Sequence, residues 1–466
     1  MLGMGNMRQW LMNISLVGGW FPAAAFAVVA VLSVTLLVSA AVSKRDGRIL
    51  ATVLPIGVEA VSGMVGYVVA WLLSDVFVVF GVGLGSRVMA WVAAGFAIAG
   101  FVIAHIVLSR GMMRVAAAIL TVFAILAAAI GIDQSYGEYA TIGSLFGEDS
   151  YSQADLTGLA KRKDLITVAQ WRKQAANGTI RNIPANGTVN KIDIPATKSQ
   201  FEARKALVYL PPAALADSKR KPALPVVLML SGQPGSPGRV FQAGGIQTMM
   251  DGYAKTHDGL APIVIAADQL GADSHNTLCV DSKVYGNALT YLTQDVVDWV
   301  KTNLPAAQDA KDWAIAGFSQ GATCSLQIGV NHPDLFGTMI PTDSEIKPTN
   351  GSRQEMIDRF FDGDTTAYEN QVPVNAIRNH APTHQMLIIG AGEKDTTSIR
   401  NVKTIAPVAA KAGMRVAAVE SSGNAHDWHA VQDVLRYGLA VFGHDTGLDG
   451  ANPNLSDYPN LKRITI

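Results

Sequence analysis

The chain has 466 residues, of which 49% are hydrophobic and 16% are charged, and its 37 basic and 37 acidic side chains cancel to a formal net charge of zero. A neutral chain has no general field that would attract nucleic acid, so we expect no nucleic-acid role. The two cysteines exclude a disulfide framework and any four-cysteine metal site. Almost all of the excess apolar residues precede residue 133, which predicts a membrane part followed by a soluble part.

The first part of the chain contains four nearly uncharged apolar runs, at about residues 20–43, 51–73, 88–109 and 115–132. Each run is near the roughly 20 residues that a membrane-spanning helix needs, and helical hydrogen bonding satisfies the backbone inside lipid. We therefore predict a membrane domain, residues 1–132, with four transmembrane helices. The first run could be a cleaved secretory signal, but its length and the three later runs favour a retained anchor.

The basic residues of the short loops predict the orientation of these helices. The loops before the second and fourth runs hold Lys44, Arg45, Arg48, Arg110 and Arg114. The loop between the second and third runs offers only Arg87. Because short cytoplasmic loops are enriched in basic residues, we expect a multi-pass protein of the cell membrane with both termini outside the cytoplasm. Arg8, in the amino-terminal segment, is a minor exception to this pattern.

Two further segments follow the membrane domain. Residues 133–177 lose the apolar density and gain polar residues, which predicts a juxtamembrane linker with a short helix near Leu156–Trp171. In residues 178–466, short β-rich runs alternate with longer helical patterns such as Asn287–Asn303, which predicts a mainly parallel sheet with helices on both faces. We expect strands at Val189–Ile194, Lys205–Leu210, Val226–Leu230, Ile263–Ala267, Trp313–Ala316, Met386–Ile389 and Val416–Glu420.

The segment Gly317–Gly321, with the sequence Gly-Phe-Ser-Gln-Gly, lies between the predicted strand Trp313–Ala316 and a run that can start a helix. A sharp strand-to-helix turn exposes a serine hydroxyl at the top of such a sheet, and flanking glycines avoid steric clash in the turn. An ordinary turn is the alternative, but the motif in this context favours Ser319 as a nucleophile.

A serine nucleophile needs a general base and an acid that orients the base. In this architecture they follow in the order Ser, Asp or Glu, His. The loop after Met386–Ile389 holds Asp395, our predicted acid, with Glu393 as the alternate. The late loop holds His426, our predicted base, with His429 as the alternate. No third ligand is evident for a zinc site on the two histidines, and we expect neither metal nor cofactor.

Acyl transfer forms an oxyanion, which needs backbone N–H donors. One should come from Gln320, the residue after the nucleophile, and the other from Gln233 on the loop after Val226–Leu230. Cys279 and Cys324 should both lie near the upper rim of the sheet. In an extracytoplasmic domain they could form a disulfide, and two buried free thiols are the alternative.

These residues resemble the esterase D and mycolyltransferase group of esterases within the α/β-hydrolases, over about residues 186–445. The matching segments are the Gly317–Gly321 turn, the Ser231–Gln233 loop, the Gly392–Asp395 loop and Asn424–Trp428. Residues 268–271, 276–282 and 291–295 are similar to actinobacterial members that carry several amino-terminal membrane spans. The resemblance implies an α/β-hydrolase fold and an enzyme that cleaves esters or transfers acyl groups at the cell envelope.

Within this group, mycolyltransferases use a glutamate as the triad acid and esterase D relatives an aspartate, so Glu393 and Asp395 leave the subgroup open. The membrane anchor favours an esterase, because mycolyltransferases are generally secreted without membrane spans. The leading hypothesis is a membrane-anchored, extracytoplasmic serine esterase that hydrolyses esters of envelope or lipid-linked small molecules, with membrane lipids as its surroundings. The alternatives are an acyltransferase that uses a sugar or lipid alcohol, and a non-catalytic membrane adaptor whose hydrolase domain only binds a ligand.

Overall fold

The computed structural model describes residues 4–42, 48–77, 79, 83–149, 151–160, 164–218 and 220–466. The chain divides into two compact units, one with residues 1–148 and 425–427 and the other with residues 149–424 and 428–466. Lys44 and Arg45, on which the predicted membrane orientation partly depends, lie outside the described residues.

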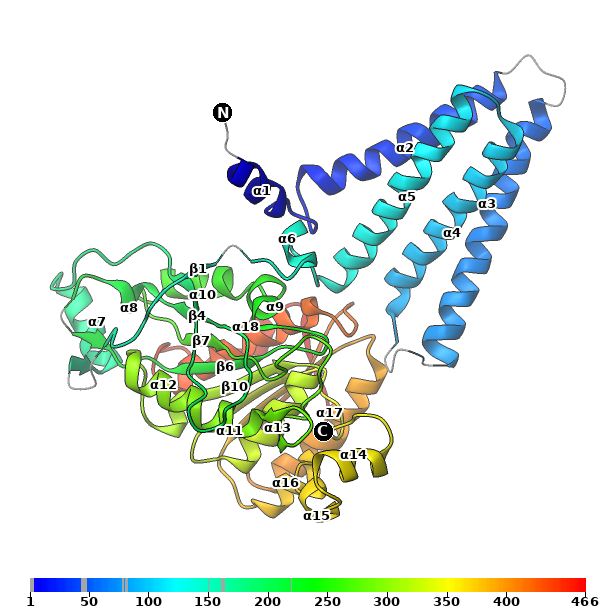
Figure 1. The fold of residues 1–466 in the computed structure, drawn as a ribbon. Helices are drawn as coiled ribbons and strands as arrows, with labels where there is room; N and C mark the ends of the chain where they lie inside the picture. The colour runs from blue at the N-terminus through cyan, green and yellow to red at the C-terminus, as the bar shows by residue number, and fades with distance from the viewer. Residues whose placement is uncertain are drawn as a thin grey trace. The chain divides into compact units, whose positions relative to one another are not determined.

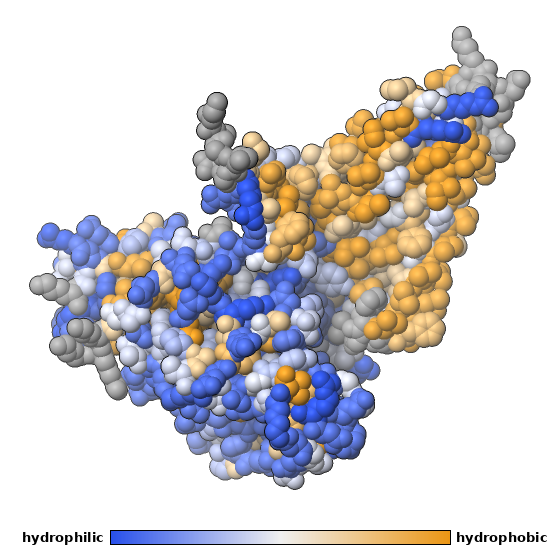
Figure 2. Space-filling model, in the orientation of Figure 1, coloured by the Kyte–Doolittle hydropathy of each residue, from blue (hydrophilic) through white to orange (hydrophobic). Residues whose placement is uncertain are grey.

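The first unit contains the four predicted spans. They are α2 (Trp20–Ala41), α3 (Arg48–Trp71) with the π-helical turn η1 (Leu72–Val76), α4 (Gly85–Leu108) and α5 (Met112–Tyr136) (Figure 1). All four are long and apolar enough to cross a membrane. Large apolar side chains such as Met64 and Val107, each 70% exposed, cover their outer surface (Figure 2). Helices in lipid require such a surface, because no water is there to solvate polar groups.

Small residues bring the helices of this bundle close together. Helix α3 packs on α4, α4 on α5, and α5 on α2. A Cβ atom added to Gly66 would lie 2.6 Å from the Cβ of Phe96, and one added to Gly100 would lie 2.2 Å from the Oγ of Ser62. Close approach through small residues is typical of packing between membrane helices.

The segments before α2 and after α5 are bonded to each other. They carry the short helices α1 (Met4–Met12) and α6 (Ile142–Leu145). Ser15 forms an antiparallel bridge with Thr141, and Arg8 pairs with Glu148. Both ends of the bundle therefore meet, and the charge of Arg8 is balanced by a carboxylate.

The second unit is built on a ten-stranded sheet (Figure 1). In spatial order the strands are β1 (Ser152–Gln153), β3 (Thr188–Ile192), β4 (Ala206–Leu210), β7 (Ile263–Ala266), β6 (Val226–Leu230), β10 (Trp313–Phe318), β11 (Thr338–Thr342), β12 (Met386–Gly392), β13 (Arg415–Ser421) and β14 (Leu461–Arg463). Strands β7 to β13 in this order are parallel, whereas β4 is antiparallel to β3 and β7, and β14 to β13. The predicted mainly parallel sheet is confirmed.

The central strands of the sheet are buried on both faces. Successive residues of a strand point to opposite sides of a sheet. In β6, Val226 and Leu228 belong to one hydrophobic cluster, and Val227 and Met229 belong to another. The first face is covered by α12 (Val296–Asn303), α13 (Gln320–Asn331), α16 (Pro373–Asn379) and α17 (Thr396–Lys411), and the second by α9 (Pro237–Gln242), α10 (Ile246–Lys255) and α18 (Trp428–Asp445). Burial on two sides explains why the strands are continuous apolar runs in the sequence.

Shorter elements surround this framework. The predicted helix Asn287–Asn303 is present as α11 (Ala288–Thr290), the π-helical turn η3 (Tyr291–Asp295) and α12. Two further helices, α14 (Arg353–Phe360) and α15 (Thr365–Glu369), contribute to a third hydrophobic cluster that includes Leu278. Other short elements are α8 (Pro212–Leu215), the 3₁₀ turns η4 (Ala310–Asp312) and η5 (Leu455–Asp457), and the small sheets β2 (Leu165–Ile166) with β5 (Lys221–Pro222) and β8 (Asp281–Ser282) with β9 (Gly286–Asn287).

Strand β11 is not among the strands that the sequence predicts. Its fourth residue is Pro341, and proline in a run argues against a central strand because it has no N–H for the ladder. In the structure, the ladder between β11 and β12 includes Met339 and resumes at Thr342, passing over Pro341. The strand is retained because its residues are buried on both faces.

Residues 149–177, predicted as part of a linker, belong to the second unit. Strand β1 joins the main sheet beside β3. Trp171, on α7 (Val168–Ala176), is fully buried, and its Nε1–H donates to the carbonyl oxygen of Asp258 at 3.1 Å. A few large apolar side chains are thus sufficient to dock a segment whose average composition is polar.

We expect Trp171→Ala to destabilise the second unit by about 3–5 kcal/mol, the usual cost of truncating a buried aromatic side chain. Lys173→Ala, at an exposed position of the same helix, is the control and should change stability by less than about 0.5 kcal/mol. The measurement is urea unfolding of the full chain in detergent, followed by circular dichroism. Equal midpoints for the two variants would show that the segment does not contribute to the fold.

Candidate active site

Ser319 occupies a sharp turn between β10 and α13. Its backbone has φ 56° and ψ −117°, a conformation that is strained for any residue with a side chain. Its N–H donates to the carbonyl oxygen of Thr342 at 3.0 Å, which ties the turn to the end of β11. The side chain is half-buried. A strained serine between a buried strand and a helix has the geometry of a nucleophile elbow.

Gly317 and Gly321 allow the main chain to fold back on itself at this turn. A Cβ atom on Gly317 would lie 2.2 Å from the carbonyl oxygen of Gly321. One on Gly321 would lie 2.3 Å from the carbonyl oxygen of Ser231, at the exit of β6. Only glycine fits such close contacts, which explains why glycine occupies both flanking positions of the motif.

His426 lies close to two buried carboxylates. One ligand atom each of Asp343, Asp395 and His426 lie within 4.8 Å of one another. Asp343 and Asp395 are 0% and 3% exposed, and His426 is half-buried on the loop between β13 and α18. A histidine beside a buried carboxylate is the arrangement that activates a serine. The same three groups could also hold a metal ion.

Asp343 is a member of this cluster that the sequence reasoning missed. It follows β11 directly, and its Oδ1 accepts a hydrogen bond from the Gly392 N–H at 2.9 Å. Asp395 caps α17, where its Oδ1 accepts from the Ser398 N–H at 3.0 Å. The sequence could have indicated Asp343 through the strand that precedes it, because the carboxyl ends of neighbouring parallel strands meet at one edge of the sheet. Pro341 in β11 argued against a strand there, so Asp343 was not selected.

The two alternate residues have other environments. Glu393 is exposed, and its Oε2 accepts from the Gly423 N–H at 2.7 Å while its Oε1 pairs with Lys462 Nζ at 3.0 Å. The Gly423 N–H, and then Lys462, lower the pKa of the Glu393 carboxyl below its usual value. His429 lies in the first turn of α18 and is half-buried. The structure brings Asp395, rather than Glu393, to His426.

The loop after β6, residues 231–236, passes beside the nucleophile. A Cβ atom on Gly232 would lie 3.5 Å from the Cβ of Ser319. Gln233 follows, and its side-chain amide lies 3.3 Å from the carbonyl oxygen of Ser274. Gln320 is the first residue of α13, where main-chain N–H groups have no partner within the helix. The two predicted donors therefore belong to segments that meet at Ser319.

Cys279 and Cys324 are joined by a disulfide, with their Cα atoms 5.7 Å apart. It links the long loop after β7 to α13. The side-chain amide nitrogen of Gln320 lies 3.2 Å from the Sγ of Cys324 and 3.3 Å from the Oδ1 of Asn276. The disulfide thus braces the rim of the sheet next to the nucleophile.

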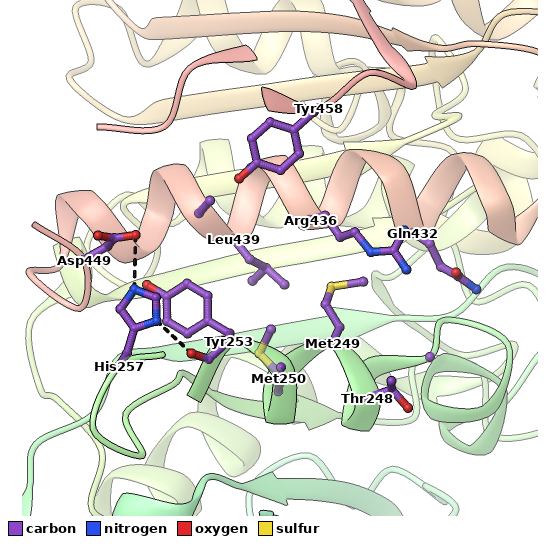
Figure 3. A pocket seen from close by; sticks show the side chains of 13 residues that line it. Thr248, Met249, Met250, Tyr253, His257, Gln432, Arg436, Leu439, Asp449 and Tyr458 are labelled. Carbon is purple, nitrogen blue, oxygen red and sulfur yellow. Dashed lines mark hydrogen bonds and ion pairs between the residues drawn. The ribbon is translucent and has the colours of Figure 1, made fainter. Parts of the chain in front are cut away.

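A separate groove of about 650 Å³ lies between α10 and α18 (Figure 3). At one end His257 Nε2 lies 3.2 Å from Asp449 Oδ2, and its Nδ1 lies 2.7 Å from the carbonyl oxygen of Tyr253. Met249 and Leu439 are among the apolar side chains that line it. None of the predicted catalytic or oxyanion residues lines this groove, so it is distinct from the elbow.

The sequence matches a family model described as "Putative esterase" over residues 198–438. An uncharacterized protein of Corynebacterium glutamicum is 32% identical over 333 residues, which cover 70% of this chain and 74% of that protein.

Solved structures with a similar fold include an S-formylglutathione hydrolase from Agrobacterium tumefaciens, with a TM-score of 0.46 and 16% identity over 57% of this chain and 99% of that one. They also include MPT51 of Mycobacterium tuberculosis, with a TM-score of 0.40 and 14% identity over 55% of this chain and 98% of that one.

The close contacts of Gly321 generate a stability prediction. Gly321→Ala should destabilise the second unit by about 1–3 kcal/mol, the usual cost of overpacking a core. Gly252→Ala is the matched control, because Gly252 lies in α10 with nothing within 4 Å of an added Cβ. Alanine there should stabilise the helix by about 0.5–1 kcal/mol. Thermal unfolding of both variants measures the two effects, and a shift of the same sign in both would contradict the steric account.

Proposed function

The chain belongs to the esterase family of the α/β-hydrolases and is a serine hydrolase of esters, and from this premise we propose that it is a membrane-anchored, extracytoplasmic esterase acting through Ser319, His426 and Asp395. The observation that carries the proposal is the approach of His426 to buried Asp395 at the edge of the sheet where the strained Ser319 turn lies. A half-buried histidine held by a carboxylate has the role of a general base in such a site.

The reaction follows from these positions. Ser319 Oγ attacks the ester carbonyl carbon while His426 accepts the hydroxyl proton, and Asp395 stabilises the imidazolium that forms. The main-chain N–H groups of Gln320 and Gln233 stabilise the negative charge on the carbonyl oxygen. Collapse of the intermediate expels the alcohol, which takes the proton from His426. Water then repeats the sequence on the acyl-enzyme and releases the carboxylic acid.

We assign the acid to Asp395 and a supporting role to Asp343. Asp395 occupies the helix-capping position after β12, and its second oxygen can orient the imidazole while its first caps α17. Asp343 is fully buried, and its Oδ1 holds the Gly392 N–H, so it fixes the end of β12 from which the Asp395 loop departs.

The proposed location is supported by three observations on different parts of the chain. Four helices are long and apolar enough to cross a membrane. Arg110 lies between α4 and α5, and Arg114 lies in the first turn of α5, as expected of basic residues at a cytoplasmic loop. The Cys279–Cys324 disulfide fits an oxidising compartment. Anchoring raises the effective concentration of the enzyme near membrane-associated esters, which favours envelope or lipid-linked substrates.

Ser319→Ala should lower hydrolysis of p-nitrophenyl esters by roughly 10³-fold or more, since the nucleophile is lost. Ser325→Ala is the control, because Ser325 lies buried on the same helix and donates to the Ala322 carbonyl oxygen. It should retain both activity and labelling by a fluorophosphonate probe. Labelling of the Ser319→Ala protein, or activity in it equal to that of the control, would exclude Ser319 as the nucleophile.

The same probe in a membrane-impermeant form tests the location. Applied to intact cells, it should label Ser319 in the wild-type protein, and labelling only after lysis would reverse the proposed orientation. Product analysis with an added alcohol separates hydrolysis from acyl transfer, because transfer yields a new ester in place of the free acid.

The environments of Asp395, Asp343 and Glu393 predict how strongly the neutralisation of each carboxylate lowers kcat. Asp395→Asn should lower kcat by about 10³–10⁴-fold, because the amide holds the wrong tautomer of the histidine, while asparagine still caps α17. Asp343→Asn keeps an acceptor for Gly392 and should cost less. Glu393→Gln should be near wild type. Steady-state kinetics measure the order, and a larger loss in Asp343→Asn than in Asp395→Asn would transfer the acid role to Asp343.

A further inference from the structure

Gln269 is a fully buried residue that the proposed chemistry does not use. It lies just beyond β7, at the carboxyl edge of the sheet, and β7 pairs with β6 up to Ala266 and Met229. The residue therefore stands beside the exit of β6, where the oxyanion loop of residues 231–236 begins.

The side chain of Gln269 bridges the two segments that carry the proposed oxyanion donors. Its Nε2 lies 2.7 Å from the carbonyl oxygen of Ser231, the first residue of the loop, and 3.2 Å from the Oε1 of Gln320, the residue after the nucleophile. Thr277 Oγ1 donates to the carbonyl oxygen of Gln269 at 2.7 Å, which holds its main chain in place. One buried amide thus connects the loop and the elbow.

The preceding residue holds the far end of the same loop. Asp268 is fully buried and accepts from Arg204 Nη2 at 2.7 Å and from Arg204 Nε at 2.9 Å. The same Nη2 donates to the carbonyl oxygen of Gly235 at 2.9 Å. Asp268, through Arg204, and Gln269 therefore hold carbonyl groups at the two ends of the oxyanion loop.

We propose that Gln269 is a positioning residue that sets the oxyanion donors by fixing the Ser231 end of the loop against Gln320. The inference depends on the proposed function. Donors act on the transition state only when they are already aimed at the developing charge, and a displacement near 1 Å can cost about 100-fold in rate. The loop contains Gly232 and Gly235, whose backbones are intrinsically permissive, so its conformation depends on outside contacts.

A matched residue separates positioning from general stability. Gln385 is also buried, and its Nε2 donates to the carbonyl oxygens of Gly329 and Phe336, at 2.7 Å in each case. It precedes β12, at the opposite end of that strand from Asp395. Gln385→Met and Gln269→Met therefore remove comparable amide bonds at nearly constant volume, but only Gln269→Met affects the oxyanion loop.

The test is steady-state ester hydrolysis by the full-length variants in detergent, with Tm measured in parallel. Gln269→Met should lower kcat by about 10–100-fold with KM near wild type, because an oxyanion contact is realised only in the transition state. It should slow fluorophosphonate labelling of Ser319 to a similar degree. Gln385→Met should lower Tm and leave kcat unchanged.

A wild-type kcat in folded Gln269→Met, or an equal loss in Gln385→Met, would overturn the inference. If Gln269→Met does not fold, Gln320→Met is measured instead, since it removes the side-chain partner and keeps its own main-chain N–H. It should show a smaller loss in kcat alone, and an unchanged kcat would overturn the inference. Wild-type protein without turnover or labelling would instead refute the proposed function, and the inference with it.

Discussion

The close approach of three main-chain segments at the end of β10 constrains the rest of the site. β6 and β10 are neighbours in parallel register, with Gly317 opposite Leu230, and the chain must turn back immediately after β10 to begin α13. Gly321 is then pressed against the carbonyl oxygens of Leu230 and Ser231. The strained backbone of Ser319 and the course of the loop after β6 both follow from this contact. The strained backbone of Ser319 persists because the packed strands around it leave no room for a relaxed conformation.

The order of the strands gathers the chemistry from distant parts of the sequence. β10, β11, β12 and β13 are consecutive in the sheet, and the segments that follow them contribute Ser319, Asp343, Asp395 and His426 in turn. Parallel strands bring all of these ends to one edge. β10, β11 and β12 are buried on both faces, so most of this edge belongs to a rigid framework. The reacting groups can therefore lie on short loops without losing their alignment.

The parts of the site that could be predicted from the sequence are those with a local pattern. The elbow has glycines on both sides of Ser319, because a side chain at either position would clash with nearby main-chain atoms. Asp343 has no such pattern, because its place depends on a strand whose proline hides it. The burial of Trp171 could not be predicted either, because it depends on contacts with residues far along the chain, such as Asp258. The contacts of Gln269 join the loop after β7 to the loop after β6 and to the first residue of α13, and they likewise have no local pattern in the sequence.

The segments before α2 and after α5 are hydrogen-bonded to each other, and these bonds allow a simple experiment on membrane topology. The Leu16 N–H donates to the Ala140 carbonyl oxygen and the Ile142 N–H to the Ile14 carbonyl oxygen, each at 3.0 Å. A ladder of this kind cannot form across a bilayer, so in the proposed membrane-anchored arrangement the amino terminus and the chain that leads into the hydrolase unit lie on the same side of the membrane. No candidate span follows α5 among the described residues. In that arrangement, an epitope fused ahead of α1 reports the side of the membrane on which the proposed active site lies, with no change to residues 149–466.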